Sequence, residues 1–224
     1  MHKRKIEVSR RNLIGAVTLM PFSAIGGTSA NSTLTVGLIG SGGRGTYVAD
    51  LLMKNTPARV VALCDLFDDR IERARKQLEV RDPKIFKDYR ELLESDVDAV
   101  IIATPVFLHP EHFEAAVRAK KHIYIEKPAA VDVTGCKRIM KAADGADRNL
   151  NITFGFQARY GPCYRTAKKA LDGGAIGPIR MAHGHFIKGA VDEGRAPVPP
   201  PKTELEKIRQ WQRWRATYGD IIVE

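Results

Sequence analysis

A glycine-rich turn between two apolar runs constrains this chain more than any other feature. Residues 35–65 read TVGLIGSGGRGTYVADLLMKNTPARVVALCD and carry G-x-G-x-x-G at Gly40, Gly42 and Gly45. The two apolar runs predict buried strands, and the apolar residues between them recur at helical spacing. A strand, a glycine turn, a helix and a second strand are the parts of a βαβ unit that binds a dinucleotide.

Each of the three glycines has its own physical task in such a turn. Gly40 permits the tight turn, Gly42 lets the backbone approach a pyrophosphate, and Gly45 lets the helix pack closely on the strand. The first turn of the helix then offers unpaired N–H groups and the positive end of its dipole to the phosphates. The segment therefore predicts a nucleotide site rather than a merely structural turn.

The acid that ends the second strand indicates which dinucleotide is favoured. Asp65 follows Gly45 by twenty residues, where a carboxylate accepts hydrogen bonds from both ribose hydroxyls of an adenosine. The same negative charge repels a 2′-phosphate, which favours NAD over NADP. Arg44 and Arg70 are the residues that keep NADP possible as the cofactor.

Composition excludes several other classes of protein. The chain has 224 residues, of which 44% are hydrophobic and 28% charged, as in a globular protein of one large or two small domains. The formal net charge of +10 falls to about +6 without the first thirty residues and is mixed in sign, so no nucleic-acid partner is predicted. Cys64, Cys136 and Cys163 lack metal-ligand spacing, and no apolar run is long enough for stable membrane insertion.

Residues 1–30 are predicted to be an export signal. A basic start precedes SRRNLI at residues 9–14, an apolar segment to Ile25 and small residues up to Ala30. This pattern resembles a twin-arginine signal and predicts the periplasm as the location, with the twin-arginine export machinery as a partner. An accidental arginine pair ahead of an ordinary signal or a mobile tail is the alternative. Because the twin-arginine route carries folded proteins, we expect the cofactor to be loaded before export and retained.

Helical and apolar patterns alternate along the rest of the chain. They predict an α/β fold with a doubly wound parallel sheet over residues 31–155, followed by an incomplete second α/β domain over residues 156–224. The predicted helices are 67–79, 88–94, 109–119, 132–147 and 164–171, and the predicted strands after Asp65 are 97–103, 123–125, 151–156 and 179–187. Leu205, Ile208, Trp211 and Trp214 predict an amphipathic helix against the core or a subunit.

A second chemical signal lies where the strand 123–125 ends, in Glu126-Lys127-Pro128. Open α/β sheets bind ligands at the carboxyl ends of their strands, and Thr104-Pro105 ends the preceding strand. A lysine at this edge would point into the crevice that holds the nicotinamide. A surface lysine in a proline turn is the alternative, but the position in a nucleotide-binding sheet favours function.

Four motifs in this order resemble the Gfo/Idh/MocA oxidoreductase family: VGLIGSGGRG, the acid of VVALCD, DVDAVIIATP with a histidine four residues later, and HIYIEKPAA. The match covers residues 34–158 and implies a Rossmann domain followed by an α/β domain that shapes the substrate cleft. One departure is Lys120, which stands where the family usually has a helix-ending glycine. The resemblance implies that the dinucleotide is held by Gly40, Gly42, Gly43, Arg44, Gly45 and Asp65, that Thr104, Pro105 and His109 lie along its nicotinamide half, and that Glu126 and Lys127 lie at the reacting end.

Several residues after the first domain are candidates for contact with cofactor or substrate. Gln157 is expected to touch the nicotinamide amide, and Arg159 and Tyr160 are expected to touch substrate; structural hydrogen bonds are equally compatible with these residues. His185 is a further candidate, on one strand face with His183. No metal site is predicted, because this histidine pair has no third ligand.

These signals predict a secreted NAD(P)-dependent oxidoreductase that transfers hydride between a sugar or polyol hydroxyl and a tightly held cofactor. Lys127 would polarise the hydroxyl and relay its proton, and a homo-oligomer is expected through the C-terminal domain. An NAD-dependent glycosidase of the same fold is one alternative, against which Lys127 speaks. A nucleotide-binding remnant without turnover is another, because the chain resembles the front half of a longer protein whose next segment would carry a histidine and an aspartate.

Overall fold

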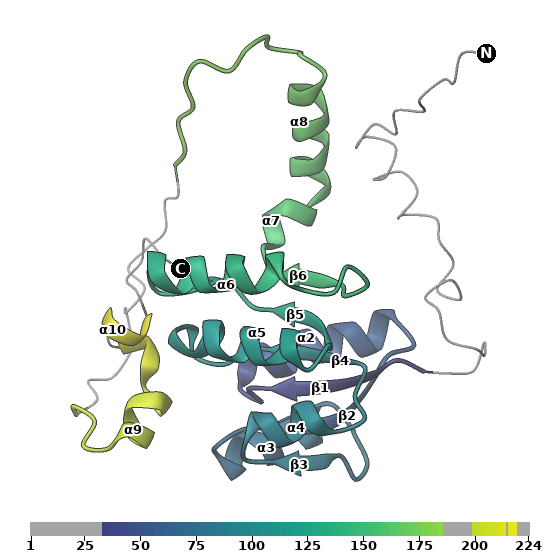
Figure 1. Ribbon diagram of the computed structural model, residues 1–224, viewed down its shortest axis with the longest axis vertical. Helices are drawn as coiled ribbons and strands as arrows, with labels where there is room; N and C mark the ends of the chain where they lie inside the picture. The colour runs from purple at the N-terminus through teal and green to yellow at the C-terminus, as the bar shows by residue number, and fades with distance from the viewer. Residues whose placement is uncertain (1–32, 186–198, 214, 219–224) are drawn as a thin grey trace. The chain divides into compact units, whose positions relative to one another are not determined.

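The computed structural model describes residues 33–185, 199–213 and 215–218 (Figure 1). The chain divides into two units, Met1–Leu34 and Thr35–Glu224. The predicted export signal, residues 1–30, lies outside the described residues. The predicted domain boundary near residue 155 falls inside the second unit, between the last strand and the helix that follows it.

The second unit is built on a six-stranded parallel sheet with the strand order β3-β2-β1-β4-β5-β6. This is the order of two mononucleotide-binding halves that run outward from a central pair of strands, and it confirms the predicted doubly wound α/β fold. The order reverses between β1 and β4, where such sheets bind their ligands. The strands are β1 (Thr35–Ile39), β2 (Arg59–Cys64), β3 (Lys84–Phe86), β4 (Ala99–Ile102), β5 (His122–Ile125) and β6 (Ile152–Phe154).

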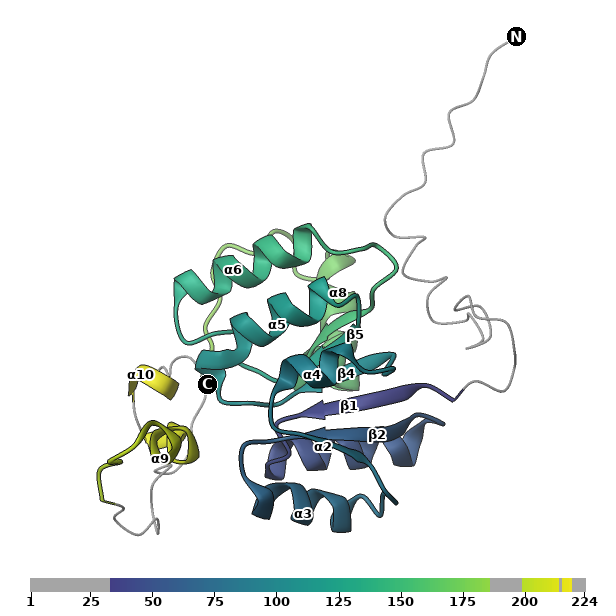
Figure 2. The ribbon, with the colours of Figure 1, turned by 60° about the horizontal axis from the view of Figure 1, so that its bottom comes forward.

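Helices cover both faces of this sheet. Figure 2 shows α4, α5 and α6 on one face and α2 and α3 on the other. The helices are α2 (Gly43–Asn55), α3 (Asp68–Gln77), α4 (Tyr89–Glu94), α5 (His109–Arg118) and α6 (Val133–Asp144), with a 3₁₀ turn, η2 (Val106–Leu108), before α5. Two of them begin at an aspartate cap, since Asp88 accepts a hydrogen bond from the N–H of Arg90 and Asp132 from that of Gly135.

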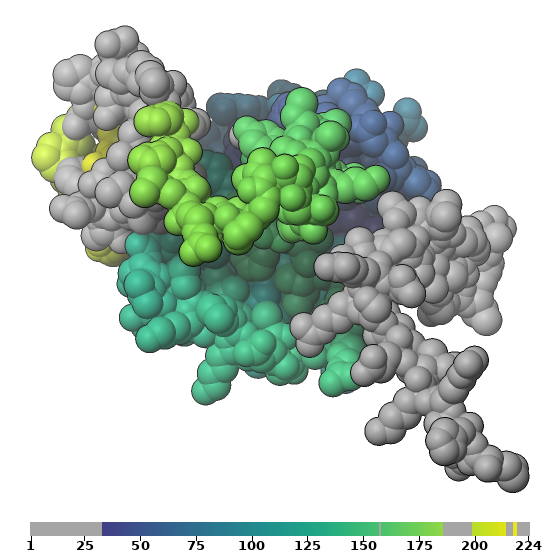
Figure 3. All heavy atoms as spheres, turned by 90° about the horizontal axis from the view of Figure 1, so that it is seen from above, coloured from purple at the N-terminus to yellow at the C-terminus, as the bar shows by residue number. Residues whose placement is uncertain are grey.

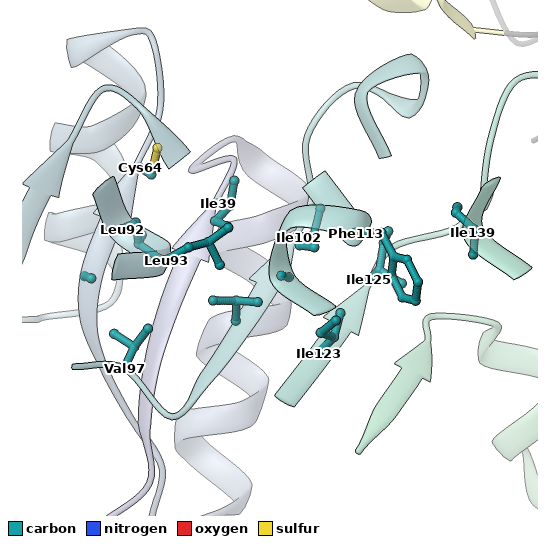
Figure 4. Packing of buried hydrophobic residues seen from close by; sticks show 13 residues of the cluster. Ile39, Cys64, Leu92, Leu93, Val97, Ile102, Phe113, Ile123, Ile125 and Ile139 are labelled. Atoms are coloured by element: carbon teal, nitrogen blue, oxygen red, sulfur yellow. The ribbon is translucent and has the colours of Figure 1, made fainter. Parts of the chain in front are cut away.

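The core lies between the sheet and the helices of the first face (Figure 4). Ile39, Ile102 and Ile125 are the last residues of three adjacent strands, β1, β4 and β5, and are at most 1% exposed. Leu92 and Phe113 pack on them from α4 and α5 and are fully buried. Burial on both faces explains why these strands read as continuous apolar runs rather than alternating ones. Because all the strands are parallel, their carboxyl ends lie at the same edge of the sheet.

The segment after β6 differs from the sequence prediction. Helix α8 (Pro162–Asp172) agrees with the helix predicted at 164–171, whereas the short α7 (Gln157–Tyr160) was not predicted. The predicted strand 179–187 is wrong for its described part, residues 179–185, which form no strand. A strand needs a neighbour to pair its backbone groups, and the described residues provide none there. Figure 3 shows this segment in light green on one face, where Ile179 and Met181 are 62% and 76% exposed.

The amphipathic helix predicted from Leu205, Ile208 and Trp211 forms only in part. It consists of α9 (Glu204–Arg209), the 3₁₀ turn η3 (Trp211–Arg213) and the short α10 (Arg215–Tyr218), with a break at Gln210. Trp214, the fourth residue of the pattern, lies outside the described residues. None of the helices in the described ranges is long and apolar enough to cross a membrane.

Candidate functional site

A cavity of about 610 Å³ opens at the carboxyl ends of β1, β2 and β4. It lies at the reversal of strand order, and its lining comes from the loops that follow these strands together with the C-terminal helical segment. The lining residues are Ile39, Gly40, Gly42, Gly43, Arg44, Cys64, Asp65, Leu66, Phe67, Arg70, Arg73, Lys87, Asp88, Tyr89, Arg90, Ala103, Thr104, Pro105, Leu108, Glu111, His112, Ile208, Arg209, Trp211 and Gln212.

The glycine turn has the geometry that a close backbone approach requires. Gly40 has φ +94°, and a Cβ there would lie 2.6 Å from the carbonyl oxygen of Ala103. A Cβ on Gly45 would overlap the carbonyl oxygen of Gly40, so only glycine lets α2 start this close to β1. A Cβ on Gly42 would meet nothing within 4 Å, because this residue faces the open cavity.

The start of α2 is suited to an anionic group. Gly42 is its N-cap, no described side chain caps it, and its first turn carries no acid. Gly42, Gly43 and Arg44 all line the cavity. Backbone N–H groups at a helix start, together with the positive end of the helix dipole, form a phosphate site.

Asp65 lies at the end of β2 and is 8% exposed. Its Oδ2 accepts a hydrogen bond from the N–H of Ser41 at 2.9 Å, and its Oδ1 accepts one from the N–H of Phe67 at 3.1 Å. Burial raises the pKa of this carboxyl, while the two N–H groups and the charge of Arg70 oppose the rise. These hydrogen bonds orient the carboxylate at the cavity wall, where it can receive hydroxyl groups.

Glu126 joins the glycine turn to the Glu-Lys-Pro segment. Its carboxylate is buried, and its Oε1 accepts hydrogen bonds from Arg44 Nε and from the Tyr124 hydroxyl, each at 2.9 Å. Its Oε2 accepts one from the backbone N–H of Lys127 at 3.2 Å. Arg44 therefore connects the start of α2 to the residue that precedes Lys127. Lys127 itself is half-buried and is not among the residues that line the 610 Å³ cavity.

The loop after β4 brings Thr104 and Pro105 to the cavity, but His109 lies behind it. His109 is 1% exposed, with Nδ1 2.7 Å from the carbonyl oxygen of Pro128 and Nε2 2.9 Å from that of Thr104. Burial lowers the pKa of this imidazole. Its ring thus bridges the backbone segments that follow β4 and β5, and the predicted contact with the nicotinamide stays a prediction.

His112, which the sequence reasoning missed, lines the cavity one helical turn after His109. Its Nδ1 lies 3.0 Å from the Thr104 hydroxyl, and its ring centroid lies 4.1 Å from that of Tyr89. Burial lowers its pKa from 6.5 to about 4, so the ring is neutral at pH 7. The signal that could have found it is the spacing of three residues, which places both histidines on one side of α5.

The cavity wall near Asp65 carries aromatic and basic side chains. The Arg70 guanidinium lies over the Phe67 ring, 4.7 Å from its centroid. Arg209 lies over the same ring at 4.0 Å, and Trp211 follows it in η3. Phe67 and Trp211 were not predicted as site residues, because no local motif distinguishes them from core aromatics.

The predicted substrate contacts Arg159, Tyr160 and His185 are not among the residues that line this cavity. Gln157, Arg159 and Tyr160 belong to α7. The side chain of Gln157 lies outside the described part of the structure. Arg159, Tyr160 and His185 are exposed. Their predicted roles toward nicotinamide and substrate stay predictions.

In the part of the chain that is described, the cysteines form no disulfide and no metal site is found. Cys64 is buried, and burial raises the pKa of its thiol to about 12. Cys136 is half-buried and Cys163 exposed, and neither forms a disulfide. No group of three or more histidine, cysteine or acidic residues in the described ranges is arranged to hold a metal ion.

Known proteins share both this sequence pattern and this fold. The chain is 31% identical over 179 residues to inositol 2-dehydrogenase of Salmonella typhimurium, covering 79% of this chain and 53% of the relative. It is also 31% identical to myo-inositol 2-dehydrogenase of Thermotoga maritima, with 79% and 48% covered. The chain therefore spans about half the length of the curated relatives it matches.

Solved structures lead to the same family. Myo-inositol dehydrogenase from Lactobacillus casei, in complex with NAD(H) and myo-inositol, superposes with a TM-score of 0.60 at 32% identity, over 65% of this chain and 43% of that one. The apo scyllo-inositol dehydrogenase of the same organism gives 0.59 at 28% identity, over 66% and 44%. Residues 34–154 match the model of an oxidoreductase family with an NAD-binding Rossmann fold. The chain belongs to this family, Gfo/Idh/MocA, as its four motifs predicted.

Proposed function

We propose that this chain forms the cofactor-binding part of an NAD(P)-dependent oxidoreductase that acts on a hydroxyl group of a polyol or sugar. The observation that carries the proposal is the Arg44–Glu126 ion pair. It connects the glycine turn, which suits a pyrophosphate, to the segment that bears Lys127. A cofactor site and a proton-transfer group thereby share one edge of the sheet.

The described residues fit a dinucleotide. Gly42 leaves open space where a Cβ would stand, and the uncapped start of α2 offers N–H groups to the pyrophosphate. The Asp65 carboxylate is oriented by two backbone N–H groups and would bind the ribose hydroxyls, which favours NAD over NADP. When bound, NAD supplies a hydride acceptor at its nicotinamide.

Lys127 would act on the substrate hydroxyl. In the direction of oxidation its amine takes the hydroxyl proton, and in the direction of reduction its ammonium returns a proton to the carbonyl oxygen. Acid–base help of this kind is typically worth roughly a hundred- to ten-thousand-fold. Glu126 would assist by holding the backbone at Lys127, through the hydrogen bond from the Lys127 N–H.

A cyclic polyol is the first substrate class to test, because the relatives from Salmonella typhimurium and Thermotoga maritima are inositol dehydrogenases. Arg159, Tyr160 and His185 are proposed substrate contacts. A homo-oligomer through the C-terminal part and export through the twin-arginine route to the periplasm also belong to this proposal. Blocking twin-arginine export should leave the precursor, with its first thirty residues uncleaved, in the cytoplasm.

The proposal is tested by binding and turnover on the same sample. We expect NAD to bind stoichiometrically by calorimetry, more tightly than NADP, and inositol isomers or related polyols to change the nicotinamide absorbance. Stoichiometric binding without turnover on any polyol or sugar would favour a nucleotide-binding role instead. Cleavage of an aryl glycoside without net formation of NADH would favour the glycosidase.

A further inference from the structure

A short C-terminal segment forms one wall of the cofactor cavity. Residues 204–213, comprising α9 and η3 and called the strap below, contribute Ile208, Arg209, Trp211 and Gln212 to the lining. They line the same cavity as Asp65. The strap is far from this region in the sequence, since Arg209 and its partner Asp69 are 140 residues apart. The strap belongs to neither the glycine turn nor the Glu-Lys-Pro segment, so the roles of those two motifs do not account for its position at the cavity.

The first anchor of the strap is Arg209. Its Nη2 donates to Asp69 Oδ1 at 2.7 Å and its Nη1 to Asp69 Oδ2 at 3.3 Å, so the two side chains pair through two hydrogen bonds. The same guanidinium lies 4.0 Å from the Phe67 ring centroid, in cation–π geometry. Arg70 Nη2 also lies 3.5 Å from the carbonyl oxygen of Arg209. These contacts fasten α9 to the start of α3.

The second anchor lies on the other side of η3. The Thr217 hydroxyl donates to the carbonyl oxygen of Trp211 at 2.6 Å, and Thr217 is 3% exposed. The helix of Thr217, α10, contacts η2, the turn that follows Pro105. The Tyr218 ring lies 6.0 Å from the Trp211 ring. Trp211 is therefore held between the segments that follow β2 and β4, the two neighbours of β1.

The position and chemistry of the strap point to the adenosine end of the cofactor. Asp65 marks the ribose, the start of α2 marks the pyrophosphate, and the cavity continues from Asp65 past Phe67 to Trp211. A half-buried indole offers a flat apolar face of the kind on which nucleic-acid bases stack. We infer that the strap is the adenosine wall of the dinucleotide site, that Trp211 contacts the adenine, and that opening of the strap limits cofactor release.

This inference rests on the proposed cofactor and is tested on the full chain by the rate at which excess NAD displaces bound NADH. Trp211→Ala should accelerate release about tenfold, because it removes the stacking surface. Trp211→Phe keeps an aromatic face and should remain within about threefold of the wild type. Urea unfolding without cofactor checks that both variants fold.

A second variant tests the strap without touching the cavity. Asp69 does not line the cavity, and Asp69→Asn should accelerate release about threefold by weakening the exposed pair with Arg209. The matched control is Asp50→Asn, which breaks another exposed acid–base pair, with Lys54, on α2. It should leave the release rate unchanged. Asp69→Asn combined with Arg209→Gln should release NADH no faster than Arg209→Gln alone.

The outcomes separate this inference from the proposed function. If the chain binds NAD but neither Trp211→Ala nor Asp69→Asn changes the release rate, the strap is not part of the cofactor site. If the wild-type chain binds neither NAD nor NADP, the cofactor assignment is wrong and the inference is overturned with it.

Discussion

Arg44 Nε and Nη2 both lie 2.9 Å from Oε1 of Glu126, which places one carboxylate oxygen between the glycine turn and the end of β5. The Glu126 side chain is 5% exposed and that of Arg44 is 48% exposed. The pair is therefore buried on its acidic side only. Loss of the arginine would leave a buried carboxylate supported by the Tyr124 hydroxyl and the Lys127 N–H.

Arg44→Met should lower the free energy of unfolding by about 1–2 kcal/mol, less than is typical of a fully buried pair because solvent reaches Arg44. Urea denaturation of the cofactor-free chain measures this. Adding Glu126→Gln should recover part of the loss, since it removes the uncompensated charge. Equal stability of Arg44→Met and the wild type would show that the pair contributes nothing to the fold.

Asp65→Asn should weaken NAD binding roughly tenfold or more, because hydrogen bonds to a charged group are worth about 1.5–3 kcal/mol. NADP binding should weaken less, since the carboxylate repels its 2′-phosphate. Calorimetric titration of both cofactors checks the change in preference. Asp68→Asn, on the first turn of α3, is the control and should leave the NAD/NADP preference unchanged. An equal loss of affinity for NAD and NADP would contradict the role of Asp65 in selecting NAD.

The buried ring of His112 should make stability depend on pH. Burial holds its pKa at about 4 in the folded state, against 6.5 when it is free. The unfolded chain therefore takes up a proton before the folded chain does, and stability present above pH 6.5 is lost as the pH falls toward 4. This one group should contribute about 2 kcal/mol between pH 7 and pH 5.

The measurement for His112 is urea unfolding at pH 7, 6 and 5 for the wild type and His112→Gln. The variant should lose distinctly less stability than the wild type over this range, whatever its stability at pH 7. Identical pH slopes in the two proteins would mean that His112 does not titrate as its burial requires.

Lys120 has φ +53° just after α5, with its own N–H donating to the carbonyl oxygen of Val117 and that of Lys121 to the carbonyl oxygen of Ala116. This is the helix-ending geometry that glycine adopts without steric cost. Lys120→Gly should therefore stabilise the chain by about 1 kcal/mol in thermal or urea unfolding. Lys137→Gly, the same change inside α6, should destabilise it by about 1 kcal/mol. The same sign at both positions would contradict the backbone explanation.

The sheet and its helices could be predicted because their signals are local and periodic. The continuous apolar run of β4 and the glycine turn after β1 each depend on one short stretch of sequence. Strand β3 escaped prediction, because Lys84 and Ile85 are exposed at the sheet edge and the strand has only three residues. An edge strand of this length has no apolar run that would distinguish it from a loop.

Other features could not be predicted because they depend on tertiary contacts. Whether residues 179–185 form a strand depends on a pairing partner, which the alternation of their side chains does not supply. The contact between Arg209 and Asp69 joins two segments that share no motif. Of the two histidines in α5, only His109 was a site candidate from the sequence. The sequence does not reveal that the His109 ring turns toward Pro128 while the His112 ring turns toward the cavity.

The most direct test of the central claim is to measure NAD binding and polyol turnover for the wild type and Lys127→Ala on the same samples. The account predicts that turnover falls by roughly a hundred- to ten-thousand-fold while NAD affinity changes little. Turnover that is unchanged in Lys127→Ala would contradict the assignment of Lys127 as the proton-transfer residue of this oxidoreductase.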